Sequence, residues 1–114
     1  MWTITVSGHF DAAHSLPGVE VCAALHGHTW KCEVVIEGKS LNRHMMLVDF
    51  RDIKECWRKY DHTHLNDSIS MPTAEVIARG IYSDVSKKLH SILSRVVSVK
   101  VWESPDSCVE YRGT

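Results

Sequence analysis

The chain has no long apolar run, no basic block and no Cys-x-x-Cys pair. No apolar stretch approaches the roughly 20 residues that a membrane-spanning helix needs, so we expect no membrane insertion. Lysine and arginine (13) nearly balance aspartate and glutamate (14), for a net charge of −1. A nucleic-acid partner would require a positive surface, so none is expected.

Linkers and low-complexity segments are also absent, and 114 residues is the size of one domain, 1–114. Hydrophobic residues make up 44% and charged residues 24% of the chain, which argues against disorder. The composition therefore indicates a single globular domain.

Four cysteines stand at positions 22, 32, 56 and 108. Their even number permits disulfides, but the N-terminus begins at once with an alternating pattern and shows no signal-peptide core. We therefore expect reduced thiols and a cytoplasmic protein. Cys32, Cys56 and Cys108 lie in apolar-periodic segments and are predicted to be small core residues. Only Cys22 has chemically active neighbours.

Hydrophobic periodicity predicts four strands and two helices. Residues 2–7, 29–37, 97–101 and 108–112 alternate or are rich in β-branched side chains, as strands are. Asp49 is a predicted cap for a first helix, and Pro72-Thr73 opens a second. The first helix has an apolar stripe of Phe50, Ile53, Trp57 and Tyr60; the stripe of the second is Ile77, Ile81, Val85, Leu89 and Ile92. Residues 61–71 between them are predicted to form a polar loop.

The order is therefore strand–strand–helix–helix–strand–strand, which predicts an α+β domain with both helices on one face of an antiparallel sheet. The outer strands of such a sheet leave open edges. Edges of this kind are often closed by pairing with other subunits, so we expect an oligomer.

His26-Gly27-His28 is the most informative stretch of the chain. Side chains two apart on a strand share a face, so both imidazoles can reach one metal ion. His14, near the end of the preceding strand, is the third candidate. Three neutral histidines with an open fourth position are typical of catalytic zinc. The alternative is that these are ordinary surface or buried histidines, as we expect for His9, His44 and His90.

Two further features carry titratable groups. Asp61 beside His62 can orient the imidazole in a proton relay, although a plain polar loop explains the same residues. Glu103 follows Val97, Val99 and Val101 at the same parity and should face the buried side, where a carboxylate needs a partner. That partner is either a ligand with two N–H donors or an ion pair with Lys100 or Arg112.

Taken together, these segments resemble the 6-pyruvoyltetrahydropterin synthase superfamily, and most closely its 6-carboxy-5,6,7,8-tetrahydropterin synthase branch. The likeness covers nearly the whole chain. Its motifs are Phe10-x-Ala-Ala-His14, Cys22-x-x-x-His26-Gly-His28, Asp49-Phe50, Asp61-His62-x-x-Leu65-Asn66, Pro72-Thr73-x-Glu75, Glu103 and the ending Cys108-Val-Glu-Tyr111-Arg112-Gly113. The loop between His14 and Cys22 is shorter than usual in this family, and His64 replaces a frequent aromatic residue.

The resemblance implies a role for each matching residue. The zinc ligands fall on His14, His26 and His28, and the catalytic base falls on Cys22. The relay pair falls on Asp61 and His62, while Glu103 anchors the pterin and Thr73 lies near its ring. The implied fold is the tunnelling fold, or T-fold, in which subunits pair into a trimeric barrel. Two trimers then form a hexamer with active sites between subunits.

The implied reaction is zinc-dependent. 7,8-Dihydroneopterin triphosphate loses triphosphate and acetaldehyde to give 6-carboxy-5,6,7,8-tetrahydropterin, on the route to 7-deazaguanine bases such as queuosine. Two enzymatic alternatives share the fold: a pyruvoyl-forming synthase that releases triphosphate alone, and a folate-pathway variant, which would want a glutamate near Cys22. A zinc- or pterin-binding module without turnover would not need Cys22 as a base, and a structural zinc site would need a fourth protein ligand.

Overall fold

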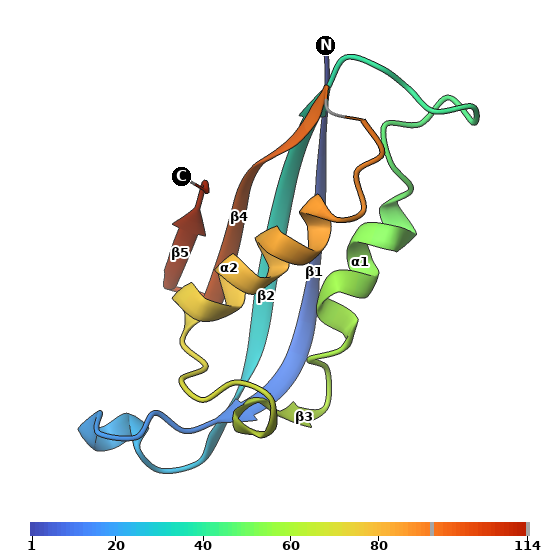
Figure 1. Ribbon diagram of the computed structural model, residues 1–114. Helices are drawn as coiled ribbons and strands as arrows, with labels where there is room; N and C mark the ends of the chain where they lie inside the picture. The colour runs from blue at the N-terminus through green and yellow to red at the C-terminus, as the bar shows by residue number, and fades with distance from the viewer. Residues whose placement is uncertain (92, 114) are drawn as a thin grey trace.

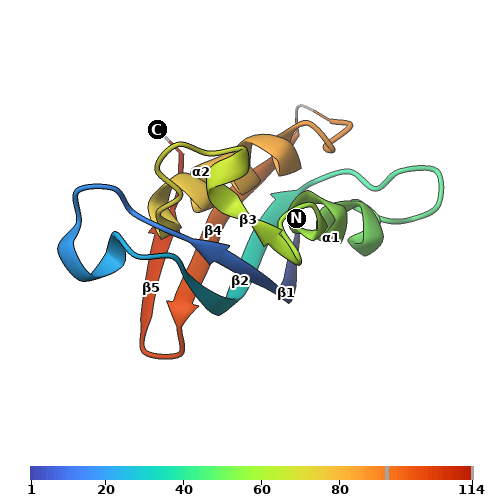
Figure 2. The ribbon, with the colours of Figure 1, turned by 90° about the horizontal axis from the view of Figure 1, so that it is seen from below.

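The computed structural model describes residues 1–91 and 93–113. Five strands form one sheet in the order β3-β1-β2-β4-β5. They are β1 (Trp2–His14), β2 (His26–Gly38), β3 (Thr63–His64), β4 (Ser94–Ser104) and β5 (Ser107–Tyr111). Helices α1 (Phe50–Arg58) and α2 (Ala74–Ser86) both lie on one face of the sheet, and the other face is open (Figures 1 and 2). The predicted α+β architecture is confirmed.

Strands β1 and β2 form a long hairpin in the middle of the sheet. The two strands pair antiparallel over their whole length, from Trp2 opposite Gly38 to His14 opposite His26. Both run further than the predicted segments, because alternation continues through Phe10, Ala12 and His14 on the helix-covered face. As expected from parity, Trp30 and Cys32 are fully buried on that face.

Segment 61–71 contains regular secondary structure where a polar loop was predicted. Thr63 and His64 form β3, which pairs in parallel with Ala12 and Ala13 of β1, so the sheet is mixed and not wholly antiparallel. A 3₁₀ turn, η2 (Leu65–Asp67), follows and buries Leu65 in the core. Two residues are too few for an alternating pattern, which is why periodicity did not detect this strand.

Each helix begins at its predicted cap. Asp49 accepts from the N–H of Arg51, and the Thr73 hydroxyl accepts from the N–H of Val76. Ile53, Trp57 and Tyr60 are buried, but Phe50 is 55% exposed, so the predicted stripe was wrong at its first residue. Helix α2 ends at Ser86, before Leu89, and Ile92 lies outside the described residues.

The parity prediction for β4 holds only beyond an irregularity. Val35 of β2 pairs with Ser98 while Ile36 pairs with Val96, so Val97 is displaced from the ladder. Val96 enters the core in its place, whereas Val99 and Val101 are buried as expected. A bulge of this kind reverses the side-chain faces on one side of it. No helix among the described residues is long and apolar enough to cross a membrane.

Candidate active site

Three histidines meet where the paired ends of β1 and β2 leave the sheet. His14 lies directly opposite His26, and His28 lies opposite Ala12, two residues before His14. The three rings are perpendicular or steeply inclined to one another, with centroids 4.5 to 5.1 Å apart. The buried indole of Trp30 packs edge-on against His14 and His28 and donates its N–H to the carbonyl of Ala12. The structure therefore brings the three predicted residues together on a rigid base.

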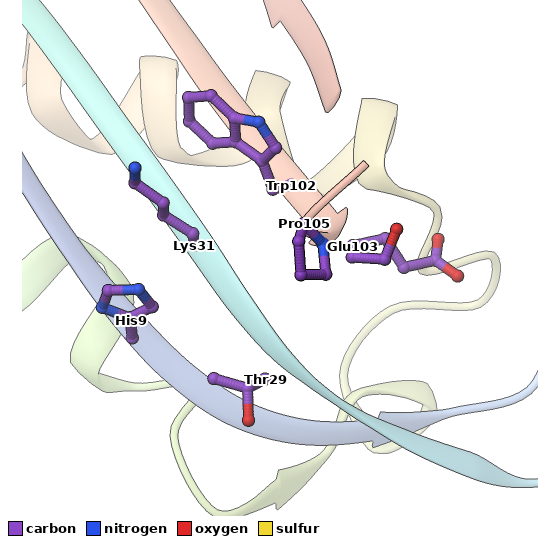
Figure 3. Close-up of a pocket in the computed structure, with 7 residues that line it drawn as sticks. His9, Thr29, Lys31, Trp102, Glu103 and Pro105 are labelled. Atoms are coloured by element: carbon purple, nitrogen blue, oxygen red, sulfur yellow. The ribbon is translucent and has the colours of Figure 1, made fainter. Parts of the chain in front are cut away.

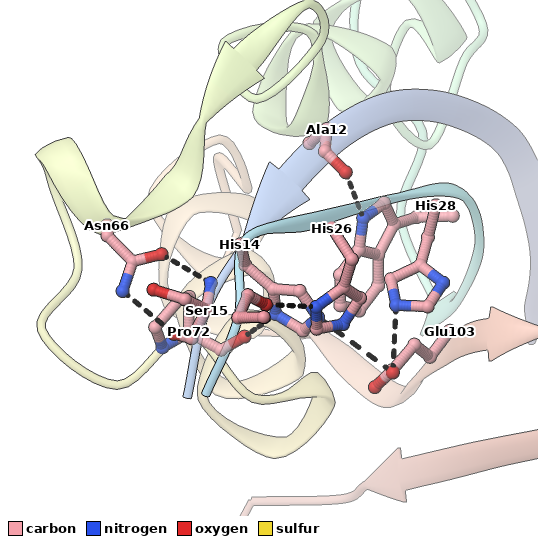
Figure 4. Close-up of polar contacts among 10 residues, drawn as sticks. Ala12, His14, Ser15, His26, His28, Asn66, Pro72 and Glu103 are labelled. Carbon is pink, nitrogen blue, oxygen red and sulfur yellow. Dashed lines mark hydrogen bonds and ion pairs between the residues drawn. The ribbon is translucent and has the colours of Figure 1, made fainter. Parts of the chain in front are cut away.

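Main-chain carbonyls set the tautomer of two of these rings. Nδ1 of His14 lies 2.8 Å from the carbonyl oxygen of Pro72, and Nδ1 of His26 lies 2.7 Å from that of Ala24 (Figure 4). A carbonyl oxygen can only accept, so each Nδ1 must carry the proton. In the neutral ring, Nε2 then keeps its lone pair, and this is how outer contacts prepare histidine for a metal ion.

The electrostatics suit a metal ion at this group. Among the described residues, Nε2 of His14 and Nε2 of His28 are buried without a hydrogen-bond partner. Burial lowers the pKa of His28, and His14 and His26 lower it further, against the opposing effect of Glu103. One atom from each of His14, His26, His28 and Glu103 lies within 4.8 Å of the others. Neutral imidazoles and one carboxylate are suitable ligands, so this group can hold a metal ion.

Glu103 reaches the histidines from the end of β4. Its Oε1 lies 3.0 Å from Nε2 of His28 and 3.8 Å from Nε2 of His14, and its side chain is 32% exposed. The alternative partner Arg112 instead pairs with Glu110. The carboxylate therefore meets the imidazoles, and its predicted role as pterin anchor stays a prediction.

Asp61 and His62 form a second cluster at the edge of β1. Asp61 Oδ2 lies 3.1 Å from Nδ1 of His62, and its Oδ1 accepts from the N–H of Asp11 at 2.8 Å. That N–H, followed by His62, lowers the pKa of Asp61. His62 has a left-handed backbone (φ 58°), and its N–H donates to the Asp11 carbonyl at 2.6 Å. The carboxylate thus stays charged beside an oriented imidazole, the arrangement that a relay needs.

Cys22 lies apart from both clusters. It closes the 3₁₀ turn η1 (Glu20–Cys22), in the loop that extends from the ends of β1 and β2 (Figure 1). Its carbonyl accepts from the N–H of Leu16 at 2.7 Å, and its side chain is partly buried. All four cysteines are free, as expected. Cys108, however, is exposed, so its predicted place in the core was wrong.

The buried thiols are unsuited to act as a base. Burial raises the pKa of both Cys32 and Cys56. A thiol that stays protonated is a poor nucleophile and a poor base. Among the cysteines, this leaves Cys22 and the exposed Cys108, and of these two only Cys22 lies in the segment that resembles the family motif.

Thr73 holds a structural position beside the histidines. It caps α2, and the residue before it, Pro72, accepts the hydrogen bond from His14. Sequence reasoning missed this role of Pro72 and the contacts of Asp11, because main-chain groups carry no residue-type signal.

A separate hollow lies on the open face of the sheet. Its lining includes His9, Thr29, Lys31, Trp102 and Pro105, with Glu103 at one end (Figure 3). The ammonium of Lys31 lies 4.8 Å from the centre of the Trp102 ring. In Figure 3 the Glu103 carboxylate points away from Lys31 and His9. Glu103 therefore belongs both to the lining of this hollow and to the histidine group.

The sheet, its two helices on one face and the histidine group at its end define a T-fold domain with a candidate metal centre. The chain belongs to the 6-pyruvoyl tetrahydropterin synthase family, whose model matches residues 3–114. A solved structure of 6-pyruvoyl tetrahydropterin synthase from Caenorhabditis elegans superposes with a TM-score of 0.78, at 19% identity over 99% of this chain and 96% of that one. That likeness supports the fold.

Curated relatives are closer in sequence. The chain is 40% identical to a putative 6-carboxy-5,6,7,8-tetrahydropterin synthase of Archaeoglobus fulgidus, over 96% of this chain and 94% of the relative. It is 34% identical to the 6-carboxy-5,6,7,8-tetrahydropterin synthase of Bacillus subtilis, over 91% and 80%. It is also 34% identical to a dihydroneopterin monophosphate aldolase of Pyrococcus furiosus, over 89% of each chain. These relatives indicate a pterin-processing lyase.

Proposed function

We propose that the protein is a zinc-dependent 6-carboxy-5,6,7,8-tetrahydropterin synthase. It would convert 7,8-dihydroneopterin triphosphate and water to 6-carboxy-5,6,7,8-tetrahydropterin, acetaldehyde and triphosphate, on a route to 7-deazaguanine bases such as queuosine. The observation that carries the proposal is the convergence of the rings of His14, His26 and His28, with centroids 4.5 to 5.1 Å apart and buried Nε2 atoms on His14 and His28 that make no hydrogen bond. The names of the Archaeoglobus and Bacillus relatives support the choice of reaction.

Each residue that matches a family motif has a task in this reaction. Bound by His14, His26 and His28, zinc would act as a Lewis acid on the substrate's side-chain hydroxyls. The thiolate of Cys22 takes the proton from the adjacent carbon. His62, held by Asp61, gives and receives protons in the later steps. Glu103 accepts from the two N–H donors of the pterin edge, and Thr73 lies near the pterin ring.

We further propose that the site is completed between subunits. In one protomer the histidine group and the Asp11–Asp61–His62 cluster are separate sets of atoms, and Cys22 belongs to neither. A neighbouring copy that pairs along the sheet edges would bring its Asp61 and His62 to the Cys22 of this subunit, in a trimer or hexamer. We expect this assembly in the cytoplasm, where the four free cysteines stay reduced.

A second candidate is an aldolase acting on a dihydroneopterin phosphate. It is favoured by the Pyrococcus relative, which is as similar to this chain as the Bacillus synthase is. Both reactions would begin with the same side-chain hydroxyls at the metal, so the three histidines do not distinguish them. Both reactions also break the bond between the first and second carbons of the side chain. They differ because only the synthase eliminates triphosphate and releases acetaldehyde, so the products distinguish them.

The deciding experiment is product analysis by mass spectrometry. The zinc-loaded protein is incubated with 7,8-dihydroneopterin triphosphate and, separately, with 7,8-dihydroneopterin monophosphate. Acetaldehyde and triphosphate in equal amounts support the proposal, and reduction by added alcohol dehydrogenase counts the acetaldehyde. Triphosphate without acetaldehyde identifies a pyruvoyl-forming synthase, and aldol cleavage of the monophosphate identifies an aldolase. If neither compound gives a product, the protein is a zinc- or pterin-binding module without turnover.

A further inference from the structure

Asn66 binds both main-chain groups of Ser15. Its Oδ1 accepts from the N–H of Ser15 at 2.9 Å, and its Nδ2 donates to the Ser15 carbonyl at 2.8 Å (Figure 4). The two residues are 51 positions apart in the chain. A side-chain amide carries the same donor and acceptor as a peptide group, so Asn66 acts here as an additional unit of the sheet.

This contact starts where the strand pairing stops. Strand β3 pairs with Ala12 and Ala13 of β1, and the chain then turns into η2 at Leu65. The backbone of η2 cannot continue the ladder of hydrogen bonds. The Asn66 side chain instead binds the main chain of Ser15, the residue directly after β1. Leu65, 1% exposed, fixes η2 in the core, so Asn66 projects from a rigid support.

Ser15 is the junction between two parts of the candidate site. It follows His14, the last residue of β1, and it begins the loop that leads to Cys22. The next residue, Leu16, donates its N–H to the Cys22 carbonyl and closes that loop. The His14 ring is held by Pro72, and the main chain after His14 is held by Asn66. A shift at Ser15 would therefore move both the ligand and the loop.

We propose that Asn66 is a positioning residue for the metal centre and the Cys22 loop. It fixes the direction in which the chain leaves His14, so the histidine nitrogen and the loop keep their places without a ligand. The part of this inference that concerns zinc rests on the proposed function. The part that concerns the loop does not.

The test compares N66D with N42D. Aspartate at position 66 keeps an acceptor for the Ser15 N–H but sets a second oxygen against the Ser15 carbonyl. Asn42 is the matched control, because its Oδ1 only accepts, from the N–H groups of His44 and Met46 in the loop after β2. A carboxylate can take over that task. The two variants thus make the same chemical change, with and without loss of a required donor.

Two quantities are measured: zinc affinity by competition with a chromophoric chelator, and amide hydrogen exchange of the metal-free protein by mass spectrometry. We expect N66D to bind zinc about tenfold more weakly, near the lower end of the usual loss for outer contacts of metal ligands. Exchange should rise in residues 15–25 and stay unchanged in β4. N42D should match the parent in zinc affinity and in exchange of 15–25.

Parental zinc affinity and parental exchange of residues 15–25 in N66D would overturn the proposal. If N66D does not fold, N66Q replaces it, because glutamine keeps both groups but carries them one methylene too far. Unfolding of N66D and N66Q alike would make Asn66 a residue of global stability and also overturn the proposal. A parent protein that binds no zinc would defeat the proposed function, while the exchange result would still decide the role of Asn66.

Discussion

At the scale of single residues, the chemistry depends on which nitrogen of each imidazole carries a proton. The carbonyls of Pro72 and Ala24 hold the protons of His14 and His26 on Nδ1 and leave Nε2 for a metal ion. These two acceptors are main-chain atoms from different segments, and a side-chain substitution does not remove a main-chain carbonyl. Substitution of the histidines themselves is therefore the direct test of the metal group.

His28→Ala should lose most of the metal. Removing one of the three imidazoles takes away a proposed zinc ligand, so zinc content should fall well below about one per chain. Content is measured by atomic emission after dialysis. His44→Ala is the control, because His44 is exposed in the loop after β2. Equal zinc in parent and His28→Ala would show that His28 is not a ligand.

Cys22→Ala should separate chemistry from metal binding. If the thiolate removes the proton, turnover should fall by roughly two to four orders of magnitude while zinc content and folding persist. Cys108→Ala is the matched control, since Cys108 is also a free thiol but is exposed on β5. Turnover near the parental rate in Cys22→Ala would remove Cys22 from the mechanism.

At the scale of elements, Thr73 links helix α2 to the site. Its hydroxyl caps the helix at 3.2 Å from the N–H of Val76, and Pro72 just before it holds His14. The cap therefore fixes both the start of α2 and the carbonyl that orients a ligand. Its structural contribution can be measured apart from any contact with the pterin.

Thr73→Ala should lower the free energy of unfolding by about 1 kcal/mol, the usual cost of losing a hydroxyl cap. Urea denaturation of the metal-free protein measures it. Thr73→Ser keeps the hydroxyl and should stay close to the parent. If Thr73→Ala is as stable as Thr73→Ser, the cap does not stabilise α2.

At the scale of the whole molecule, the protomer is more extended than a compact monomer of its length. Its radius of gyration is 15.0 Å, with extents of 49 × 26 × 23 Å, whereas a compact domain of this length has about 13 Å. Its accessible surface is 6943 Å², against about 6,300 Å² for a typical monomer of its mass. Beyond the short pairing with β3 at Ala12 and Ala13, the outer edge of β1 is open in the described protomer.

We therefore expect a trimer or hexamer in light scattering, with activity that depends on assembly. Cys22→Ala and His62→Asn should each be inactive alone, and subunits of the two refolded together should regain part of the activity. Asparagine suits position 62 because it tolerates the left-handed backbone there. A stable, active monomer, or no recovery in the mixture, would contradict a site shared between subunits.

The sequence by itself determined the helix caps, the alternation of β1 and β2, and the convergence of His14, His26 and His28. These depend on local patterns: parity along a strand, and side chains that satisfy free N–H groups at a helix start. The tertiary structure alone decided the short strand β3, the bulge that put Val96 in place of Val97, and the exposure of Phe50 and Cys108. It also decided the contacts of Pro72, Asp11 and Asn66. Contacts of this kind form between segments up to 58 residues apart and use main-chain groups that every residue has. No local pattern can indicate them, because they exist only once the chain has folded.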